Sequence, residues 1–400
     1  MLQKHKEHLD KSLLKTLYFV SFLLGASSAF VLYIESDYFK TAIRSDNVTL
    51  FYIVSYAAAL FLVVNWHHFI RIFGEKNVFL VTLSVKFLIV LWLAFSPVTI
   101  WSAMGLAVYM ILAVLTWLDM DILLEICSTD KVTGGIRGLY LTIQNAGYLV
   151  APFFAGYLVG NFGLPWAFRG ALIFIGAIIV TALVKINSIC DGKVKRIKFI
   201  ELLRKVSKRK NVLRIYYISF LLEFFYALMI IYTPLYLLEN GFTWGQIGKM
   251  ITFMLIPFVI LQYPAGLLAD KKFEERDMLK WSLFLMAFAT AAIYFISSGS
   301  LLVWALILFG TRIGASLVEV LRDSYFYKRI DQRDVDIVDF FRTVRPVAYI
   351  VGPLIATPVI FFLHIKFIFP IIGLVVLTGF WVTKNLASSR VPPQVTNIQC

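Results

Sequence analysis

The residues of this sequence that could do chemistry are charged side chains inside long apolar segments. Glu223 and Arg312 each lie eleven residues into such a segment. A helix rises about 1.5 Å per residue, so both would lie about 16 Å deep in a membrane. An ionised side chain at that depth costs at least about 2.5–3.5 kcal/mol unless it faces a cavity or a partner. The pair could therefore bind a solute, or it could be a permanent ion pair that joins helices.

Glu223 is also a candidate for proton coupling. Burial favours the neutral acid, whereas a nearby Arg312 favours the carboxylate, so its protonation could follow the conformation of the protein. Further candidate contacts of a substrate cavity are Arg345, Asn145, Gln144, Tyr226 and Tyr232. Lys86 lies inside an apolar segment too, and we expect its side chain to snorkel to the nearer surface.

A second group of charges lies near the ends of the apolar segments. Salt bridges among them that form in one state and break in another could make a cytoplasmic gate. Ordinary helix capping would explain some of these charges equally well. The candidates are Asp270, Lys271, Glu125, Asp121, Arg137, Glu319, Arg342 and Asp339.

The composition places these residues in a membrane protein. The chain has 400 residues, of which 60% are hydrophobic, and its mean hydropathy is +0.80. It therefore lacks the polar surface of a water-soluble protein of this size. The three cysteines are too scattered for a disulfide framework, and no metal site or cofactor is expected.

We expect twelve membrane-spanning helices, because about 20 apolar residues cross a hydrocarbon core of about 30 Å. The predicted spans are 13–34, 48–70, 77–95, 98–127, 136–159, 166–186, 212–238, 245–268, 278–297, 301–322, 337–362 and 367–384.

The net charge of +14 reports topology and gives no reason to expect nucleic acid. Lys and Arg collect in alternate loops, which places both termini on the cytoplasmic side of the membrane. We expect this membrane to be a prokaryotic cell membrane. The most basic segment, 187–211, carries nine Lys or Arg against two acids. It could be an amphipathic helix on an anionic inner leaflet or a solvated linker. We expect residues 188–211 to be a linker between two helix bundles, residues 1–187 and residues 212–400.

The two halves of the sequence resemble each other. Residues 18–24 (YFVSFLL) recur as 216–222 (YYISFLL), and Ala151-Pro152 corresponds to Gly352-Pro353. The shifts are 198 and 201 residues, which indicates two duplicated six-helix halves in parallel orientation. Halves of this kind that rock against each other give alternating access.

At the loop between the eighth and ninth spans, Gly266, Asp270 and Lys271 match the signature of the major facilitator superfamily. Phe273 departs from that signature, and in the first half only Gly74 and Lys76 match it, with Arg71 where Asp is expected. With the span count and the repeat, the chain resembles this superfamily over its whole length.

The resemblance implies an all-α membrane protein with twelve transmembrane helices in two pseudo-symmetric six-helix bundles. It also implies a secondary active transporter that moves a small solute. We expect this transporter to be a monomer whose transport is coupled to protons. A lipid flippase and a ligand sensor of the same shape are the alternatives. A membrane enzyme is disfavoured, because neither of the motifs HExxH and GxSxG occurs.

Overall fold

The computed structural model describes residues 11–45, 47–127, 133–185, 204, 206–271, 273–329 and 335–388. Within these ranges the chain is almost entirely helical and contains no strand. The helices before the basic segment, called the first half below, are α1 (Lys11–Leu32), α2 (Glu35–Ile43), α3 (Thr49–Phe73), α4 (Glu75–Phe95), α5 (Ile100–Cys127), α6 (Thr133–Phe162) and α7 (Pro165–Lys185).

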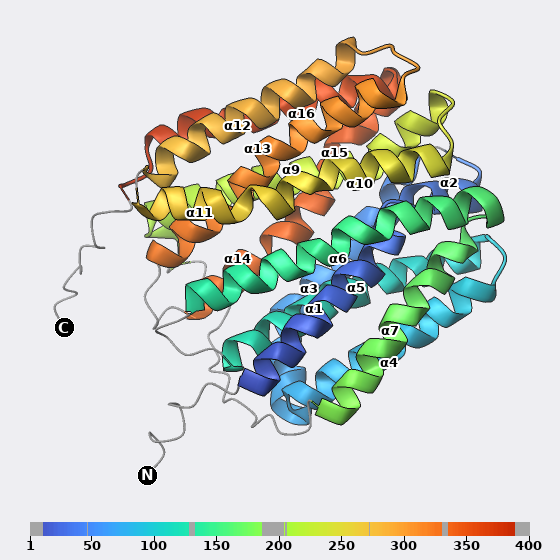
Figure 1. Ribbon diagram of the computed structural model, residues 1–400, viewed down its shortest axis with the longest axis horizontal. Helices are drawn as coiled ribbons and strands as arrows, with labels where there is room; N and C mark the ends of the chain where they lie inside the picture. The colour runs from blue at the N-terminus through green and yellow to red at the C-terminus, as the bar shows by residue number, and fades with distance from the viewer. Residues whose placement is uncertain are drawn as a thin grey trace.

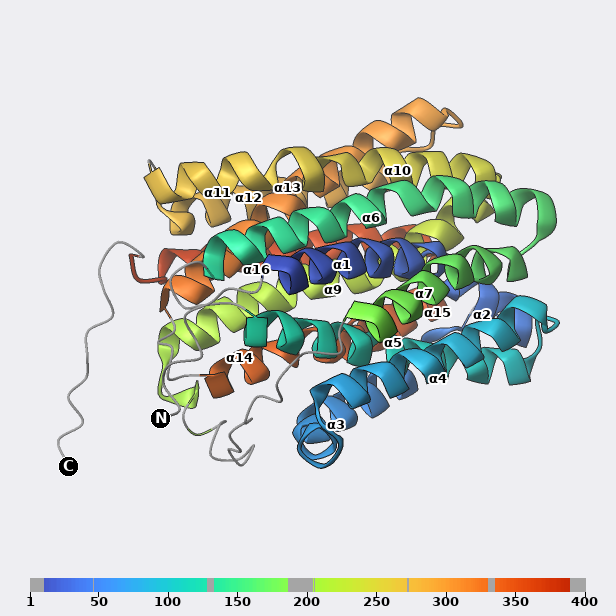
Figure 2. The same ribbon diagram turned by 60° about the horizontal axis from the view of Figure 1, so that its bottom comes forward.

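The helices after that segment form the second half. They are α9 (Lys210–Glu239), α10 (Trp244–Ile260), α11 (Gln262–Lys271), α12 (Glu275–Ala292), η1 (Ile293–Phe295), α13 (Leu301–Arg329), α14 (Val335–Arg342), α15 (Val344–Phe362), η2 (Ile365–Phe367) and α16 (Ile368–Lys384). Figures 1 and 2 show these helices lying side by side, with α4 and α12 on opposite sides of the molecule.

The predicted spans correspond to these helices. Eleven segments of the described chain are long and apolar enough to cross a membrane, and the prediction 136–159 falls within the 30-residue helix α6. The eighth and eleventh spans are each built from two helices, α10 with α11 and α14 with α15. The prediction of an all-α membrane protein is confirmed.

The first predicted span ends too early. The chain turns at Tyr33 and Ile34 and then continues as α2, so Glu35 lies on a helix instead of in an outer loop. Glu35 is buried at 4% exposure, and Tyr38 and Phe39 of the same helix are fully buried. The sequence prediction failed here because it treated the first acid after an apolar run as the start of solvent.

The same pairs of helices pack together in each half. In the first half α1 packs against α6 and α7, and α4 packs against α5 and α7. In the second half α9 packs against α15 and α16, and α12 packs against α13 and α16. The halves meet chiefly where α6 packs on α10 and where α3 packs on α15. Each of these helix pairs within one half has a counterpart within the other half, and the α6–α10 contact corresponds to the α15–α3 contact.

Two ends of the molecule are distinguished below. The terminal end is where α1 begins and α16 ends, and the far end is opposite, where α2 lies (Figure 1).

Candidate functional site

The structure does not bring Glu223 and Arg312 together. Glu223 instead forms an ion pair with Arg322, with 3.4 Å between Oε1 and Nη2. Both side chains are about nine-tenths buried, at 12% and 11% exposure. Arg322 is the last residue of the predicted span 301–322, but α13 continues to Arg329, seven residues beyond that span. The longer helix places the Arg322 side chain inside the bundle, within reach of Glu223.

Arg312 is buried at 1% exposure and forms no ion pair with a carboxylate of the described residues. Its guanidinium lies over the ring of Phe225 at 4.8 Å and over that of Tyr226 at 5.7 Å. Its Nε and Nη1 atoms have no hydrogen-bond partner among the described residues. The aromatic faces stabilise part of the charge, but donors without acceptors in a buried place are costly.

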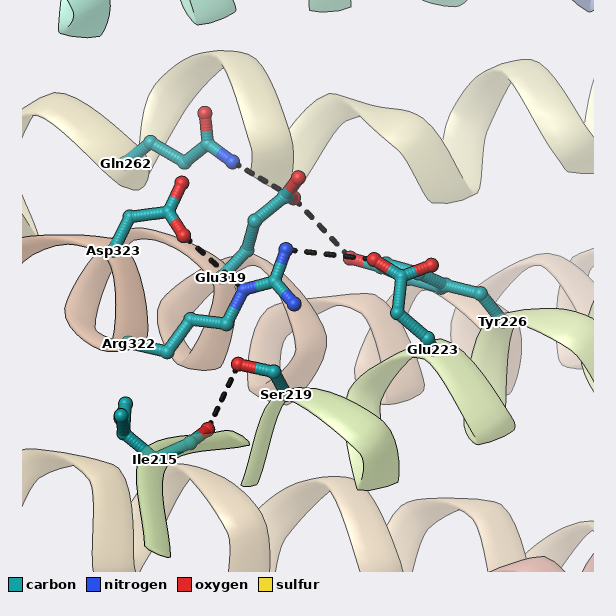
Figure 3. A network of polar contacts seen from close by, with 8 residues as sticks. All are labelled: Ile215, Ser219, Glu223, Tyr226, Gln262, Glu319, Arg322 and Asp323. Atoms are coloured by element: carbon teal, nitrogen blue, oxygen red, sulfur yellow. Dashed lines mark hydrogen bonds and ion pairs between the residues drawn. The ribbon is translucent and has the colours of Figure 1, made fainter. Parts of the chain in front are cut away.

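A polar network surrounds the Glu223–Arg322 pair (Figure 3). Tyr226 and Gln262 both donate to Oε2 of Glu319, each at 3.2 Å. Arg322 also approaches Asp323, with 3.3 Å between Nε and Oδ1. Glu319, which the sequence placed in a gate, therefore lies in a central cluster with a predicted cavity residue, Tyr226.

Asn145 extends this network across the two halves. It lies on α6, and its Nδ2 donates to Oε1 of Gln262 at 3.2 Å. Gln262 begins α11, just after α10 ends at Ile260. The other predicted amide, Gln144, is half-buried, and its backbone carbonyl lies against Gly25 of α1. Asn145 thus touches the second half, whereas Gln144 packs within the first.

Arg345, the other predicted arginine, lies at a pocket between the halves. The pocket has an empty volume of about 360 Å³, partly open to solvent, and Glu35, Tyr56, Tyr109 and Tyr148 also line it. Nε of Arg345 is buried and has no hydrogen-bond partner within the described part of the chain. The remaining lining residues are Ser28, Leu32, Met110, Ala113, Val114 and Trp117.

Lys86 does not snorkel to the surface as predicted. It is completely buried, and its Nζ lies 5.2 Å from the centre of the Tyr109 ring. It points toward the inside of the first half because α4 packs against both α5 and α7 there. Lys86 and Glu35 interact electrostatically, which gives the first half a charged cluster of its own.

Tyr232 lies apart from the pocket, in a seam at the far end. Its hydroxyl is 3.4 Å from the Thr49 hydroxyl, which accepts from Thr357 at 2.9 Å. Nearby, Trp244 donates to Asp37 of α2 at 3.0 Å. These contacts join the first half to the second at the far end.

Two of the predicted gate residues form an ion pair at the terminal end. Asp121 of α5 and Arg342 of α14 approach to 3.8 Å between Oδ2 and Nε, which links the halves again. The side chains of the other gate candidates lie outside the described part of the structure. These are Asp270, Lys271, Glu125, Arg137 and Asp339.

Sequence reasoning missed Glu35 and the tyrosines at the pocket. A signal for Glu35 is present: it is flanked by Tyr33-Ile34 and by Tyr38-Phe39, so apolar residues continue on both sides of the acid. The tyrosines carry no such signal, because buried packing and cavity lining require the same residue types.

Comparison with known proteins gives one family. The family model for the Major Facilitator Superfamily matches residues 17–333. No curated protein matches the chain.

Proposed function

This chain belongs to the Major Facilitator Superfamily of membrane transporters, and we propose that it is a secondary active transporter that moves a small solute by alternating access, coupled to protons. The observation that supports this best is the set of buried charges between the halves. Nε and Nη1 of Arg312 and Nε of Arg345 have no hydrogen-bond partner among the described residues. A protein built only for stability would have no use for such donors.

Alternating access needs two bodies that meet at few places. We propose that residues 1–187 and 212–400 are these bodies, with 188–211 as the cytoplasmic linker and both termini in the cytoplasm. The helix pairs α6 with α10 and α3 with α15 would be the surfaces that rock. At the far end the Trp244–Asp37 bond would hold one state. At the terminal end the Asp121–Arg342 pair would form and break.

Proton coupling would act through Glu223. Its 3.4 Å separation from Arg322 exceeds the roughly 2.7–2.9 Å of a strong charge-assisted hydrogen bond, so the pair is a loose one. A proton on Glu223 would remove its negative charge, and Arg322 would then interact with Asp323 and Glu319 instead. Because Glu319 accepts from Gln262, and Gln262 from Asn145, that shift would reach the contact between the halves.

The test is transport in vesicles containing the purified protein. A thermal-shift screen of a metabolite panel would first choose solutes, and accumulation would then be measured with and without an inward proton gradient. Glu223→Gln should abolish the dependence on the gradient while leaving exchange without a gradient. Glu239→Gln, a half-exposed acid at the far end, is the control and should behave as the unaltered protein.

Gradient-driven accumulation that is unchanged in Glu223→Gln would refute coupling at this residue. Binding without any movement of solute in the unaltered protein would contradict transport itself and favour a sensor.

A further inference from the structure

Two opposite charges line the pocket between the halves without neutralising each other. Glu35 of α2 and Arg345 of α15 are both lining residues. No ion pair within 4 Å joins them in the described structure, although they interact electrostatically. The first half thus supplies an acid to the pocket, and the second half supplies a guanidinium.

Each of the two charges has an atom available to a ligand. Oε2 of Glu35 and Nε of Arg345 are buried and have no hydrogen-bond partner within the described residues. Glu35 as a whole is only 4% exposed. Buried charged groups are normally satisfied by a partner. A ligand in the pocket would supply the missing acceptor for the arginine and the missing donor for the acid.

The pocket is lined by one charge of each sign, Glu35 and Arg345. A ligand with a net charge would disturb this balance in a place that water screens poorly. A ligand with one group of each sign would preserve it.

The rest of the lining is aromatic. Tyr56, Tyr109, Tyr148 and Trp117 line the same pocket. Tyr56 stacks on Tyr349 of α15 with 4.4 Å between ring centres, and Trp117 stacks on Tyr148 at 6.3 Å. Flat walls of this kind hold a flat apolar group. The space that the centre of a water-sized sphere can reach inside the pocket is about 30 Å³, which is room for only a few water molecules, so a ligand with a ring needs a wider pocket than this conformation has.

We propose that the pocket binds a small aromatic zwitterion, with its carboxylate on Arg345, its ammonium group on Glu35 and its ring between Tyr56, Tyr109 and Tyr148. This assignment rests on the proposed function, since it names the substrate class of the same transporter. Anions and cations of the same shape would each leave one of the two lining charges without a ligand group opposite it, which weakens binding.

The test uses one ring with different charges. L-phenylalanine is the zwitterion, 3-phenylpropanoate lacks the ammonium group, and 2-phenylethylamine lacks the carboxylate. L-tryptophan, 3-indolepropionate and tryptamine form a second set with a larger ring. Calorimetric titration of the purified full-length protein should give at least one zwitterion that binds about tenfold or more tighter than both of its single-charge analogues.

Two variants test separately what each of the two charges contributes to binding. Glu35→Gln should weaken binding of the zwitterion about tenfold and leave the carboxylate analogue unchanged. Arg345→Gln should weaken the zwitterion to the same degree and leave the amine unchanged. Glu239→Gln at the far end should change none of the constants. The analogue series on the unaltered protein remains decisive even where a variant does not fold.

The assignment is overturned if neither zwitterion binds, or if a single-charge analogue binds as tightly as its zwitterion. Accumulation of another solute in vesicles would then leave the transporter proposal standing. Conversely, tight zwitterion binding with no uptake of any solute would support the pocket and contradict transport.

Discussion

Two arginines on one helix show how the surroundings decide the role of a residue. Arg312 and Arg322 both lie on α13, ten residues apart. Arg322 has Glu223 and Asp323 within 3.4 Å. Arg312 has the rings of Phe225 and Tyr226 against its guanidinium and forms no ion pair within the described part of the chain. Arg322 is therefore part of the polar network, whereas Arg312 is a buried charge with no carboxylate partner among the described residues.

Replacement of Arg312 should therefore stabilise the protein. An arginine at mid-membrane costs about 2.5–3.5 kcal/mol on insertion scales, and methionine keeps the contact with the Phe225 ring. We expect Arg312→Met to raise the free energy of unfolding by roughly 1–3 kcal/mol and to abolish transport. Thermal unfolding in detergent, together with vesicle uptake, measures both.

Arg322→Met is the matched control on the same helix. It leaves Glu223 buried and unpaired, and the loss of one member of a buried pair costs roughly 3–5 kcal/mol. The unfolding temperature should therefore fall for Arg322→Met and rise for Arg312→Met. A fall in both would show that Arg312 has a stabilising partner.

At the scale of helices, two membrane spans are each interrupted shortly before a proline, and the physical reason is the same in both. Proline has no amide hydrogen, so the carbonyl four residues earlier loses its bond. Pro264 lies four residues after Ile260, where α10 ends, and Pro346 lies four residues after Arg342, where α14 ends. Both breaks lie in the second half, because α10 with α11 and α14 with α15 are the eighth and eleventh spans.

The break before Pro264 lies next to the polar network, since Gln262 is the first residue of α11. Pro264→Ala would supply the missing amide and favour one continuous helix. We expect the turnover rate to fall severalfold while solute affinity changes little, because a hinge acts on the transition between states. Initial rates of uptake over a range of solute concentrations separate the two quantities.

Pro358→Ala is the control for this variant. Pro358 lies inside α15 without ending it, so its replacement should leave the turnover rate close to that of the unaltered protein. Equal losses in the two variants would show that the effect comes from removal of a proline anywhere and not from the break.

At the scale of the whole molecule, glycines permit close contact between the halves. A Cβ atom on Gly248 of α10 would lie 2.6 Å from the Pro152 carbonyl oxygen and 3.0 Å from Cα of Gly156. A Cβ on Gly156 of α6 would lie 2.5 Å from the Trp244 carbonyl oxygen. Small residues of this kind let membrane helices approach closely. The seam between α6 and α10 therefore holds the far end together in this conformation.

Gly248→Ala should open that seam. The methyl group meets the backbone of α6, which cannot yield without moving the helix. We expect spin labels at Asn161→Cys and Ser300→Cys, in a background without the native cysteines, to shift to longer distances in electron paramagnetic resonance measurements. Gly245→Ala is the control, because nothing lies within 4 Å of its added Cβ. The same distance distribution in both variants would contradict a seam that holds the far end.

The sequence by itself determined the class of the protein. Apolar runs such as 77–95 and 166–186 can satisfy their backbone groups in a membrane only as helices, so α4 and α7 follow from composition and length. The loop charges, the repeat and the signature residue Gly266 pointed to the superfamily that the family match shows. These features are local, and a linear pattern contains them fully.

Only the tertiary structure decided which charges meet. Depth along a helix placed Glu223 and Arg312 at one level, but it gave neither their direction around the helix nor the bounds of α13. Arg322 took the place of Arg312 because α13 is longer than its apolar run, and Glu35 entered the pocket because the chain turns at Ile34 and packs α2 against the core. An ion pair depends on distances between side chains on different helices, and those distances follow from packing that no single stretch of sequence specifies.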